Sequence, residues 1–510
     1  MNAGTRGGDA AVMGASALIL AAPALPARPW PRHVLSQQGW RAMAELLPAE
    51  PGLELVALWA DAGLVHALFA DDEPLLACAP VEAGLYAALS PHRPAAAAFE
   101  RAVYDLWGHR AAGGTDARPL LDHGRWPVLH PMLPRPVPNA APPDPPRPLP
   151  VDGAGLHDLP LGPVRAGPAE PVRLCLTARG ERVVRLQAMP GHAHKGTLAL
   201  MRGKPVHGAA RLAARLAGDA TVAHSLAFAR AAEAALGIEA PPRAVALRAV
   251  MAELERVANH LGVVAAVCEA AGAGRPHARF LRRREAVLRA CEAAFGHRLM
   301  MDRVVPGGVA HDLDPAGTAA LLRALDAMEA DLPALVGLYD GHPGLAGRVR
   351  GVGVTRRDAV ARHAPGGPVG RAAGRAGDAR HTPGYAPYDR MRLRVPVLAA
   401  GDVDARVRVR LAEAGESLGV LRRLLDALPP GEAARGLPGG GGEGLGLAEA
   451  PRGDAWHWLR LEAGTVAAAF AADPGWRQWP LLDEAAQGCD ADEVPLVLES
   501  FDPSWSGVDL

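Results

Sequence analysis

Three ionisable side chains lie close together in the middle of the chain. Glu253, Arg256 and His260 are spaced at i, i+3 and i+7, which places them on one face of a helix. The spacing fits either a structural ion-pair network at a subunit interface or a relay that moves a proton or a charge. Burial raises the pKa of a carboxylic acid and a neighbouring arginine lowers it, so the sequence leaves the direction open.

A second set of side chains has the types that bind metals. His192 and His194 lie in a short glycine-flanked segment, for which loop architecture is a simpler explanation than metal binding. The cysteines are scattered and include no Cys-x-x-Cys pair, so neither a disulfide framework nor a cysteine metal cage is expected. They are Cys78, Cys175, Cys268, Cys291 and Cys489.

Composition excludes several classes of protein. The chain has 510 residues, of which 49% are hydrophobic and 21% charged, as in globular proteins of more than one domain. Its formal net charge is −1, so no overall field favours nucleic acid or an anionic membrane. The weakly apolar run at 10–26 is interrupted by prolines and too short to span a bilayer.

The elements that must position these residues indicate an α+β protein of two domains. Apolar runs around 53–69 predict a hairpin in a small α/β domain, and 171–189 predicts further strands. Leucines at helical spacing predict helices over 241–271 and 411–428 in a mainly helical second domain. The expected divisions are an N-terminal segment 1–29, a small domain 30–134, a proline-rich linker 135–158, and a large domain 159–510 with a glycine-rich loop at 431–446.

Two segments of the large domain carry a family resemblance. Residues 215–225, from Arg215 through Ala217, Ala220 and His224, and the C-terminal Asp502-Pro-Ser-Trp-Ser-Gly507 resemble the two metal-binding motifs of NiFe hydrogenase large subunits. In that family the motifs read Arg-x-Cys-Gly-x-Cys-x-x-x-His and Asp-Pro-Cys-x-x-Cys. The four cysteine positions hold Ala217, Ala220, Ser504 and Gly507 in this chain. Soft thiolates hold nickel and iron in such sites, so we expect no metal here.

Other segments extend the resemblance in the family's order. The segments 252–260, 367–380 and 401–417 are similar to blocks shared by energy-converting, formate-hydrogenlyase-type hydrogenases and the large peripheral-arm subunit of respiratory complex I. The stretch from Phe99 to Gly108 resembles the small peripheral subunit of complex I, which would be fused in front.

The resemblance implies roles for particular residues. It implies a proton relay through Glu170, His224 and Glu253, although His224 fits a structural hydrogen bond equally well. The degenerate cavity would be formed by Ala217, Gly218, Ala220, Asp502, Ser504 and Gly507, with Trp505 large enough to help fill it. The residues implied near the electron-transfer partner are Arg256, His260, Arg371, Asp378 and Arg380.

Several features of the sequence limit what this chain itself is expected to bind. Arg165 replaces the histidine of a Gly-Pro-x-His motif, and Gly218 and Ala169 fall where complex I has its quinone-binding tyrosine and histidine. No convincing dinucleotide-binding Gly-x-Gly-x-x-Gly turn is present, so NAD would bind to another subunit.

The expected protein is therefore a subunit of a membrane-associated redox complex that couples electron transfer to ion translocation without its own NiFe centre. Its partners would be an iron–sulfur small subunit, which carries the clusters, and antiporter-like membrane subunits, with no nucleic acid. It would bind peripherally to the cytoplasmic face of the inner membrane. The alternative is a non-catalytic scaffold in a complex-I-related assembly.

Overall fold

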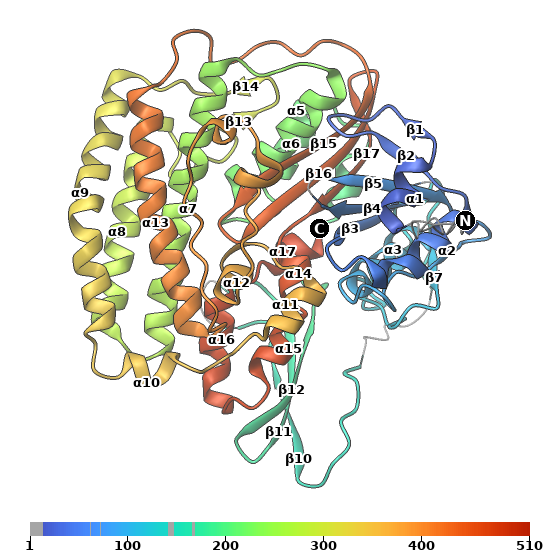
Figure 1. Ribbon diagram of the computed structural model, residues 1–510, viewed down its shortest axis with the longest axis horizontal. Coiled ribbons are helices and arrows are strands. Elements are labelled where there is room, and N and C mark those ends of the chain that lie inside the picture. The colour runs from blue at the N-terminus through green and yellow to red at the C-terminus, as the bar shows by residue number, and fades with distance from the viewer. Residues whose placement is uncertain (1–13, 62, 72, 141–146, 166–168) are drawn as a thin grey trace, which may run out of the picture.

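The computed structural model describes residues 14–61, 63–71, 73–140, 147–165 and 169–510. Its chain forms two contacting domains of mixed helix and strand (Figure 1), which confirms the α+β prediction. Within the described residues, no helix combines the length and the apolar character needed to cross a membrane.

The small domain is built on a sheet with the strand order β1-β2-β5-β4-β3. β3 and β4 form the hairpin expected at 53–69, and their inward side chains are almost wholly buried. β1 pairs with β2, so this sheet already begins within the segment 1–29. The strands of the domain are β1 (Ala24–Leu25), β2 (Arg32–Val34), β3 (Glu54–Asp61), β4 (Leu64–Ala70), β5 (Leu75–Pro80), β6 (Leu85–Ala87), β7 (Arg110–Ala112), β8 (Val128–Leu129) and β9 (Val137–Pro138). Its helices are α1 (Ala15–Ala21), α2 (Gln37–Leu46), η1 (Leu47–Ala49) and α3 (Ala96–Trp107).

Long helices form the core of the large domain and stand side by side in Figure 1. α7 (Pro242–Ala270) covers the helix predicted at 241–271, and its buried residues occupy nearly every face because α6, α8 and α13 all contact it. The helix predicted at 411–428 begins earlier, because the Asp402 side chain caps it by accepting a hydrogen bond from the Ala405 amide. The bundle consists of α6 (Thr221–Leu236), α7, α8 (Gly274–Phe295), α9 (Pro315–Asp340) and α13 (Val403–Asp426).

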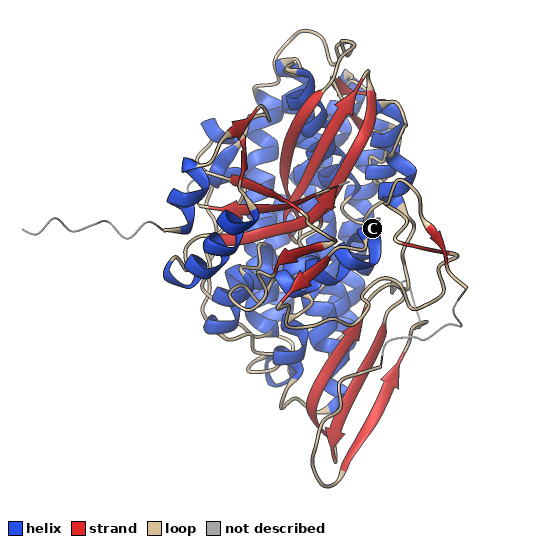
Figure 2. Cartoon of the chain, turned by 90° about the vertical axis from the view of Figure 1, so that its right-hand side faces the viewer, coloured by secondary structure: helices blue, strands red, loops and turns tan. Residues whose placement is uncertain are grey.

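Two further sheets flank this bundle (Figure 2). β10 (Leu156–Leu161), β11 (Arg173–Arg179) and β12 (Arg182–Met189) form an extended antiparallel sheet, which confirms the strands predicted at 171–189. β10 begins inside the segment predicted as linker. β15 (Gly442–Ala450), β16 (Gly453–Glu462) and β17 (Thr465–Ala472) form the second sheet, which packs on α6.

The prediction of a glycine-rich loop at 431–446 was wrong for its last residues. Gly444 and Gly446 belong to β15, and a Cβ on either would lie 2.1 Å from a carbonyl oxygen of α6. Glycine is needed there because the strand backbone lies directly against the helix backbone. Glycine thus marks a close approach of two backbones in this segment.

Short elements connect these layers and form the C-terminal region. The helical ones are α4 (Thr197–Met201), α5 (Val206–Ala213), α10 (Leu345–Val349), α11 (Arg357–His363), α12 (Gly367–Ala372), η2 (Arg380–Gly384), η3 (Tyr388–Arg390), α14 (Gly475–Gln478), α15 (Leu481–Ala486), η4 (Ala491–Glu493), α16 (Val494–Phe501) and α17 (Trp505–Asp509). The small strands β13 (Val304–Val305) and β14 (Gly308–Val309) pair with each other.

Candidate functional site

A cavity of about 930 Å³ lies where the two hydrogenase-like segments meet. α7 and α8 form one wall, and α16 with the tail that follows it forms another. Charged and apolar side chains both line it. The lining residues include Arg165, Glu170, Gly218, Asp219, Asn259, Val263, Ala266, His277, Leu281, Arg284, Arg452, Leu498, Glu499, Asp502 and Ser504.

Arg452 is the central charge at the polar end of the cavity. It comes from the turn between β15 and β16, and only 1% of its surface is exposed. Its guanidinium lies 2.5 Å from Asp219, 3.6 Å from Asp502 and 3.7 Å from Asp473. Three carboxylates around one buried guanidinium hold more negative than positive charge, which favours a bound proton.

Asp502 is the carboxylate best placed to hold that proton. Burial and the neighbouring Asp219 carboxylate raise the pKa of Asp502 to about 7, although Arg452 opposes the shift. The Asn259 side-chain amide bridges the pair, donating to Asp219 at 3.1 Å and to Asp502 at 3.2 Å. Asp502 can therefore gain and lose a proton near neutral pH.

Glu170, which the resemblance made a candidate for proton transfer, lines the same cavity. Its carboxylate accepts hydrogen bonds from the Ser506 amide at 2.8 Å and from the Ser504 hydroxyl at 3.3 Å. Burial raises the pKa of Glu170 above its ordinary value. Glu170 and Asp502 thus belong to one polar surface.

The four positions that correspond to cysteines in the family do not fit a NiFe centre. Ala217 and Ala220 are fully buried and carry no ligand atom. The Ser504 hydroxyl caps α17 by accepting from the Gly507 amide at 3.1 Å. A Cβ on Gly507 would lie 2.6 Å from the Asp473 carboxylate, so a side chain at this position has no room.

His224 belongs to a buried chain of hydrogen-bonding groups beside that position. Its Nε2 lies 3.0 Å from the Asp473 carboxylate, and its Nδ1 lies 3.2 Å from Nε2 of His457. Burial and the neighbouring His224 lower the pKa of His457 well below its ordinary value. The structure thus gives His224 the hydrogen-bonded environment that was one of its two interpretations, and His224 does not line the cavity.

Glu253 lies in a separate, fully buried ionic cluster inside the bundle. Its carboxylate accepts hydrogen bonds from Arg380 at 3.0 Å, Tyr388 at 2.8 Å and Ser417 at 2.6 Å. Burial raises the pKa of Glu253, but Arg380 and Arg256 outweigh it, and the pKa falls below its ordinary value. Glu253 is therefore an ionised member of a network at neutral pH.

Arg371 holds the other half of this ionic cluster together. It lies 2.6 Å from Glu413, 3.0 Å from Glu449 and 3.3 Å from Asp378. Nε2 of His260 lies 2.8 Å from Glu413, and burial lowers the pKa of His260 to about 4. The sequence spacing of Glu253, Arg256 and His260 had left a structural network and a relay open, and the structure places all three side chains in a buried network.

The structure brings only part of the predicted relay together, because α6 and α7 direct His224 and Glu253 into the protein interior. Of the three relay candidates, Glu170 alone lines the cavity. The side chains implied near an electron-transfer partner are all buried, and that role stays a prediction. They are Arg256, His260, Arg371, Asp378 and Arg380.

The sequence had also singled out His192, His194 and Trp505, and the structure shows what surrounds each of them. The Gly191 and Ala193 amides donate to the Asp509 carboxylate at 2.7 and 2.6 Å, so the loop with His192 and His194 holds the C-terminal tail. Among the described residues, no group of three or more His, Cys, Asp or Glu side chains is placed to hold a metal ion. Trp505 is buried and does not line the cavity.

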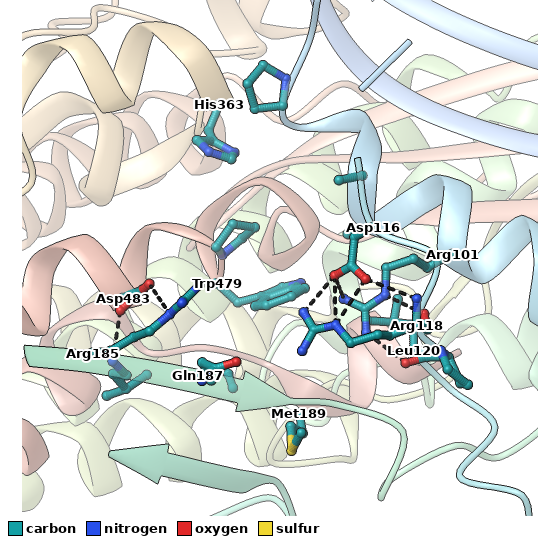
Figure 3. Close-up of a pocket in the computed structure, with 17 residues that line it drawn as sticks. Arg101, Asp116, Arg118, Leu120, Arg185, Gln187, Met189, His363, Trp479 and Asp483 are labelled. Carbon is teal, nitrogen blue, oxygen red and sulfur yellow. Dashed lines mark hydrogen bonds and ion pairs between the residues drawn. The ribbon is translucent and has the colours of Figure 1, made fainter. Parts of the chain in front are cut away.

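A smaller pocket of about 220 Å³ lies at the seam of the two domains (Figure 3). Arg101, Asp116 and Arg118 form its small-domain side, and Arg185 and Trp479 lie on its large-domain side. Its arginines are already paired, as with Arg118 and Asp116 at 2.6 Å. This pocket contains none of the residues that the motifs single out.

Sequence reasoning missed several residues of the cavity and its surroundings. Asp219 lies inside a recognised motif and Asn259 directly precedes His260, so their positions gave a signal. Three other residues lie on or beside the strands β15–β17, more than 200 residues along the chain from the motif at 215–225. No local sequence pattern marks them. They are Arg452, His457 and Asp473.

Comparison with known proteins agrees with this geometry. Residues 271–438 match the family described as "Respiratory-chain NADH dehydrogenase, 49 Kd subunit". The chain is 30% identical to a carbon monoxide-induced hydrogenase of Rhodospirillum rubrum over 354 residues, which cover 69% of this chain and 98% of that protein. It is 28% identical to hydrogenase-4 component G of Escherichia coli, over 83% of this chain and 76% of that protein.

A solved structure also shares the fold. A chain from the structure of the membrane-bound sulfane sulfur reductase, an archaeal respiratory membrane complex, superposes with a TM-score of 0.66. The match covers 71% of this chain and 100% of that chain at 24% sequence identity.

Proposed function

Because this chain belongs to the family of hydrogenase large subunits and the 49 kDa subunit of respiratory-chain NADH dehydrogenase, we propose that it couples electron transfer to ion movement in a membrane-bound redox complex. Its relatives are subunits of membrane-bound respiratory complexes. In this proposal the chain works without a NiFe centre of its own. An iron–sulfur small subunit carries the electrons, and antiporter-like membrane subunits move the ion.

The observation that carries the proposal is the polar end of the cavity. Asp502, with a pKa of about 7, shares Arg452 with Asp219 and Asp473. A change of charge in the cavity shifts the balance among these carboxylates, because unit charges a few ångströms apart interact strongly in a buried site. Asp502 would bind a proton when negative charge arrives and release it when that charge leaves.

The four former cysteine positions support the absence of the metal centre. They offer one hydroxyl and no thiolate, and the hydroxyl already caps α17. Nickel and iron in such sites depend on thiolate ligands. The chain would therefore contribute proton-accepting groups and binding surfaces, and would bind peripherally to the cytoplasmic face of the membrane through its partners.

The test is proton uptake by the assembled complex in native membrane vesicles, driven by a chemical reductant such as dithionite. Asp502→Asn should lower coupled proton uptake by about 100-fold or more, since a positioned proton-transfer group typically contributes about 10²- to 10⁴-fold. Asp492→Asn is the matched control, since that side chain is 75% exposed and lies outside the cavity lining. Unchanged uptake in Asp502→Asn would contradict the proposal.

A second candidate, the non-catalytic scaffold, is favoured by the packing at Gly507. The Asp473 carboxylate fills the space of the former ligand and ties His224 and His457 into a closed chain. In a scaffold, Asp502→Asn would leave electron transfer and proton uptake unchanged, and only substitutions that weaken assembly would reduce them.

A further inference from the structure

The segment between η3 and α13 is extended but belongs to no sheet. Met391 has φ −110° and ψ 140°, and the residues after it up to 400 adopt no helix or strand. Met391 and Leu393 pack against the core, whereas Arg392 and Arg394 are exposed. This alternation is the two-residue period of a β-strand.

The backbone of this segment has unused hydrogen-bonding groups. The Met391 amide donates to the Tyr388 carbonyl, and the Leu398 amide donates to the Arg371 carbonyl at 2.8 Å. Between these two points, residues 392–397 make no backbone hydrogen bond to any residue that the structure describes. An exposed extended segment with unpaired amides and carbonyls is a template for the addition of another strand.

The exposed side chains of the segment share one kind of charge. Arg390, Arg392 and Arg394 follow one another at two-residue spacing, and none lies within ion-pair distance of an acid in the described part of the chain. Arg390 ends η3. In an extended chain Arg392 and Arg394 are about 7 Å apart, the same distance as alternate side chains of a partner strand. Val397 and Leu398 follow and are 39% and 37% exposed.

We propose that residues 390–398 bind an extended acidic segment of another protein as an added β-strand. Main-chain hydrogen bonds would pair alternate residues within 392–397, where Pro396 can only accept. Carboxylates on alternate residues of the partner would face the arginines, and an apolar residue would cover Val397 and Leu398. A lipid headgroup or a nucleic acid would satisfy the arginines but would leave the main-chain amides and carbonyls without a strand partner. The combination therefore favours a protein segment.

Hydrogen bonds at both ends of this segment connect it to the buried ionic cluster. The Leu398 and Gly401 amides bind the carbonyls of Arg371 and Ala372 at the end of α12. Tyr388, directly before the segment, donates to Glu253. A bound partner would therefore contact a segment that is hydrogen-bonded to both halves of that cluster. This binding surface does not depend on the proton chemistry proposed for the cavity.

Hydrogen–deuterium exchange tests the strand addition directly. The assembled complex, isolated from native membranes, is compared with the purified chain. Among the amides of residues 392–395 and 397, the alternate ones that face the added strand should exchange at least about tenfold more slowly in the complex, because they become hydrogen-bonded; Pro396 has no amide. Equal exchange rates in the two samples would overturn the proposal.

Charge reversal and cross-linking identify the occupant. The triple variant Arg390→Glu, Arg392→Glu, Arg394→Glu should weaken assembly about tenfold or more at low salt. The matched control reverses Arg275, Arg279 and Arg282, three exposed arginines of α8 that also lack an acidic partner among the described residues. It should assemble like the parent, and an equal loss in both variants would contradict a specific site.

A photo-reactive amino acid at Val397 should cross-link to a protein segment that carries at least two acidic residues at alternate positions. Adducts only with lipid, with nucleic acid or with a second copy of this chain would each refute the proposal. Circular dichroism of both triple variants should match the parent, since all six side chains are exposed.

Discussion

Replacing Gly507 by alanine tests how the former ligand position is filled. Gly507 lies inside α17, where alanine normally stabilises a helix by about 0.5–1 kcal/mol relative to glycine. The new Cβ would lie 2.6 Å from both Cγ and Oδ2 of Asp473, well inside contact distance. The sign of the change in unfolding free energy therefore depends on whether Asp473 holds its place.

The geometry of Asp473 indicates that it cannot move without cost. Its carboxylate accepts a hydrogen bond from the Gly475 amide at 2.7 Å and lies 3.0 Å from Nε2 of His224, with no exposed surface on the side chain. Overpacking a core costs about 1–3 kcal/mol, and leaving a buried polar group unpaired costs about 1–3 kcal/mol more. After subtraction of the helix preference, Gly507→Ala should destabilise the protein by about 1–5 kcal/mol.

Urea unfolding followed by circular dichroism measures this difference. Gly208→Ala is the control, because it also lies within a helix, α5, and its Cβ would meet only Lys204 at 3.9 Å. That variant should be as stable as the parent or gain up to about 1 kcal/mol. If Gly507→Ala behaves like Gly208→Ala, Asp473 does not fill the ligand position and the reasoning fails.

Three further predictions concern the buried network, the cavity and the domain seam. Arg371→Met should lower the free energy of unfolding by about 3–5 kcal/mol, because it leaves Glu413, Glu449 and Asp378 buried without their shared cation; a loss below about 1 kcal/mol in urea unfolding would contradict this. A folded-state pKa of about 7 for Asp502 lies above the unfolded value, so the contribution of Asp502 to stability falls as pH rises from about 4 to 7, and the difference in stability between the parent and Asp502→Asn should change over that range; parallel pH profiles would refute the shifted pKa. Trp59→Ala should lower the free energy of unfolding by about 3–5 kcal/mol, because Trp59 stacks on Phe470 at 5.3 Å and contacts Trp458 across the seam; a loss below about 1 kcal/mol in urea unfolding would argue against this packing.

The sequence predicted those parts of the fold that depend on local patterns. The period of 3.6 residues in α7 and the continuous apolar runs of β3 and β4 are set by neighbouring residues, so both could be recognised. Gly444 and Gly446 were misread because a glycine run suggests a loop, and only the contact with α6 reveals why glycine stands in a strand. That contact joins segments some 200 residues apart.

The same limit applied to the site. Glu170 and Asp502 could be found because they accompany recognisable motifs, and both line the cavity. Arg452, Asp473 and His457 could not, since folding of the β15–β17 sheet brings them to α6 and the C-terminal tail. The sequence also placed Glu253 and His224 in one relay with Glu170, whereas the direction of the α6 and α7 faces separates them into two buried clusters.

The central claim is that this chain keeps the frame of a hydrogenase large subunit without its metal centre. Elemental analysis of the assembled complex, purified from its native membranes, tests that claim most directly. The geometry of Ala217, Ala220, Ser504 and Gly507 predicts nickel far below one atom for each copy of the chain, with iron accounted for by partner iron–sulfur clusters. Stoichiometric nickel that stays with this chain would contradict the account.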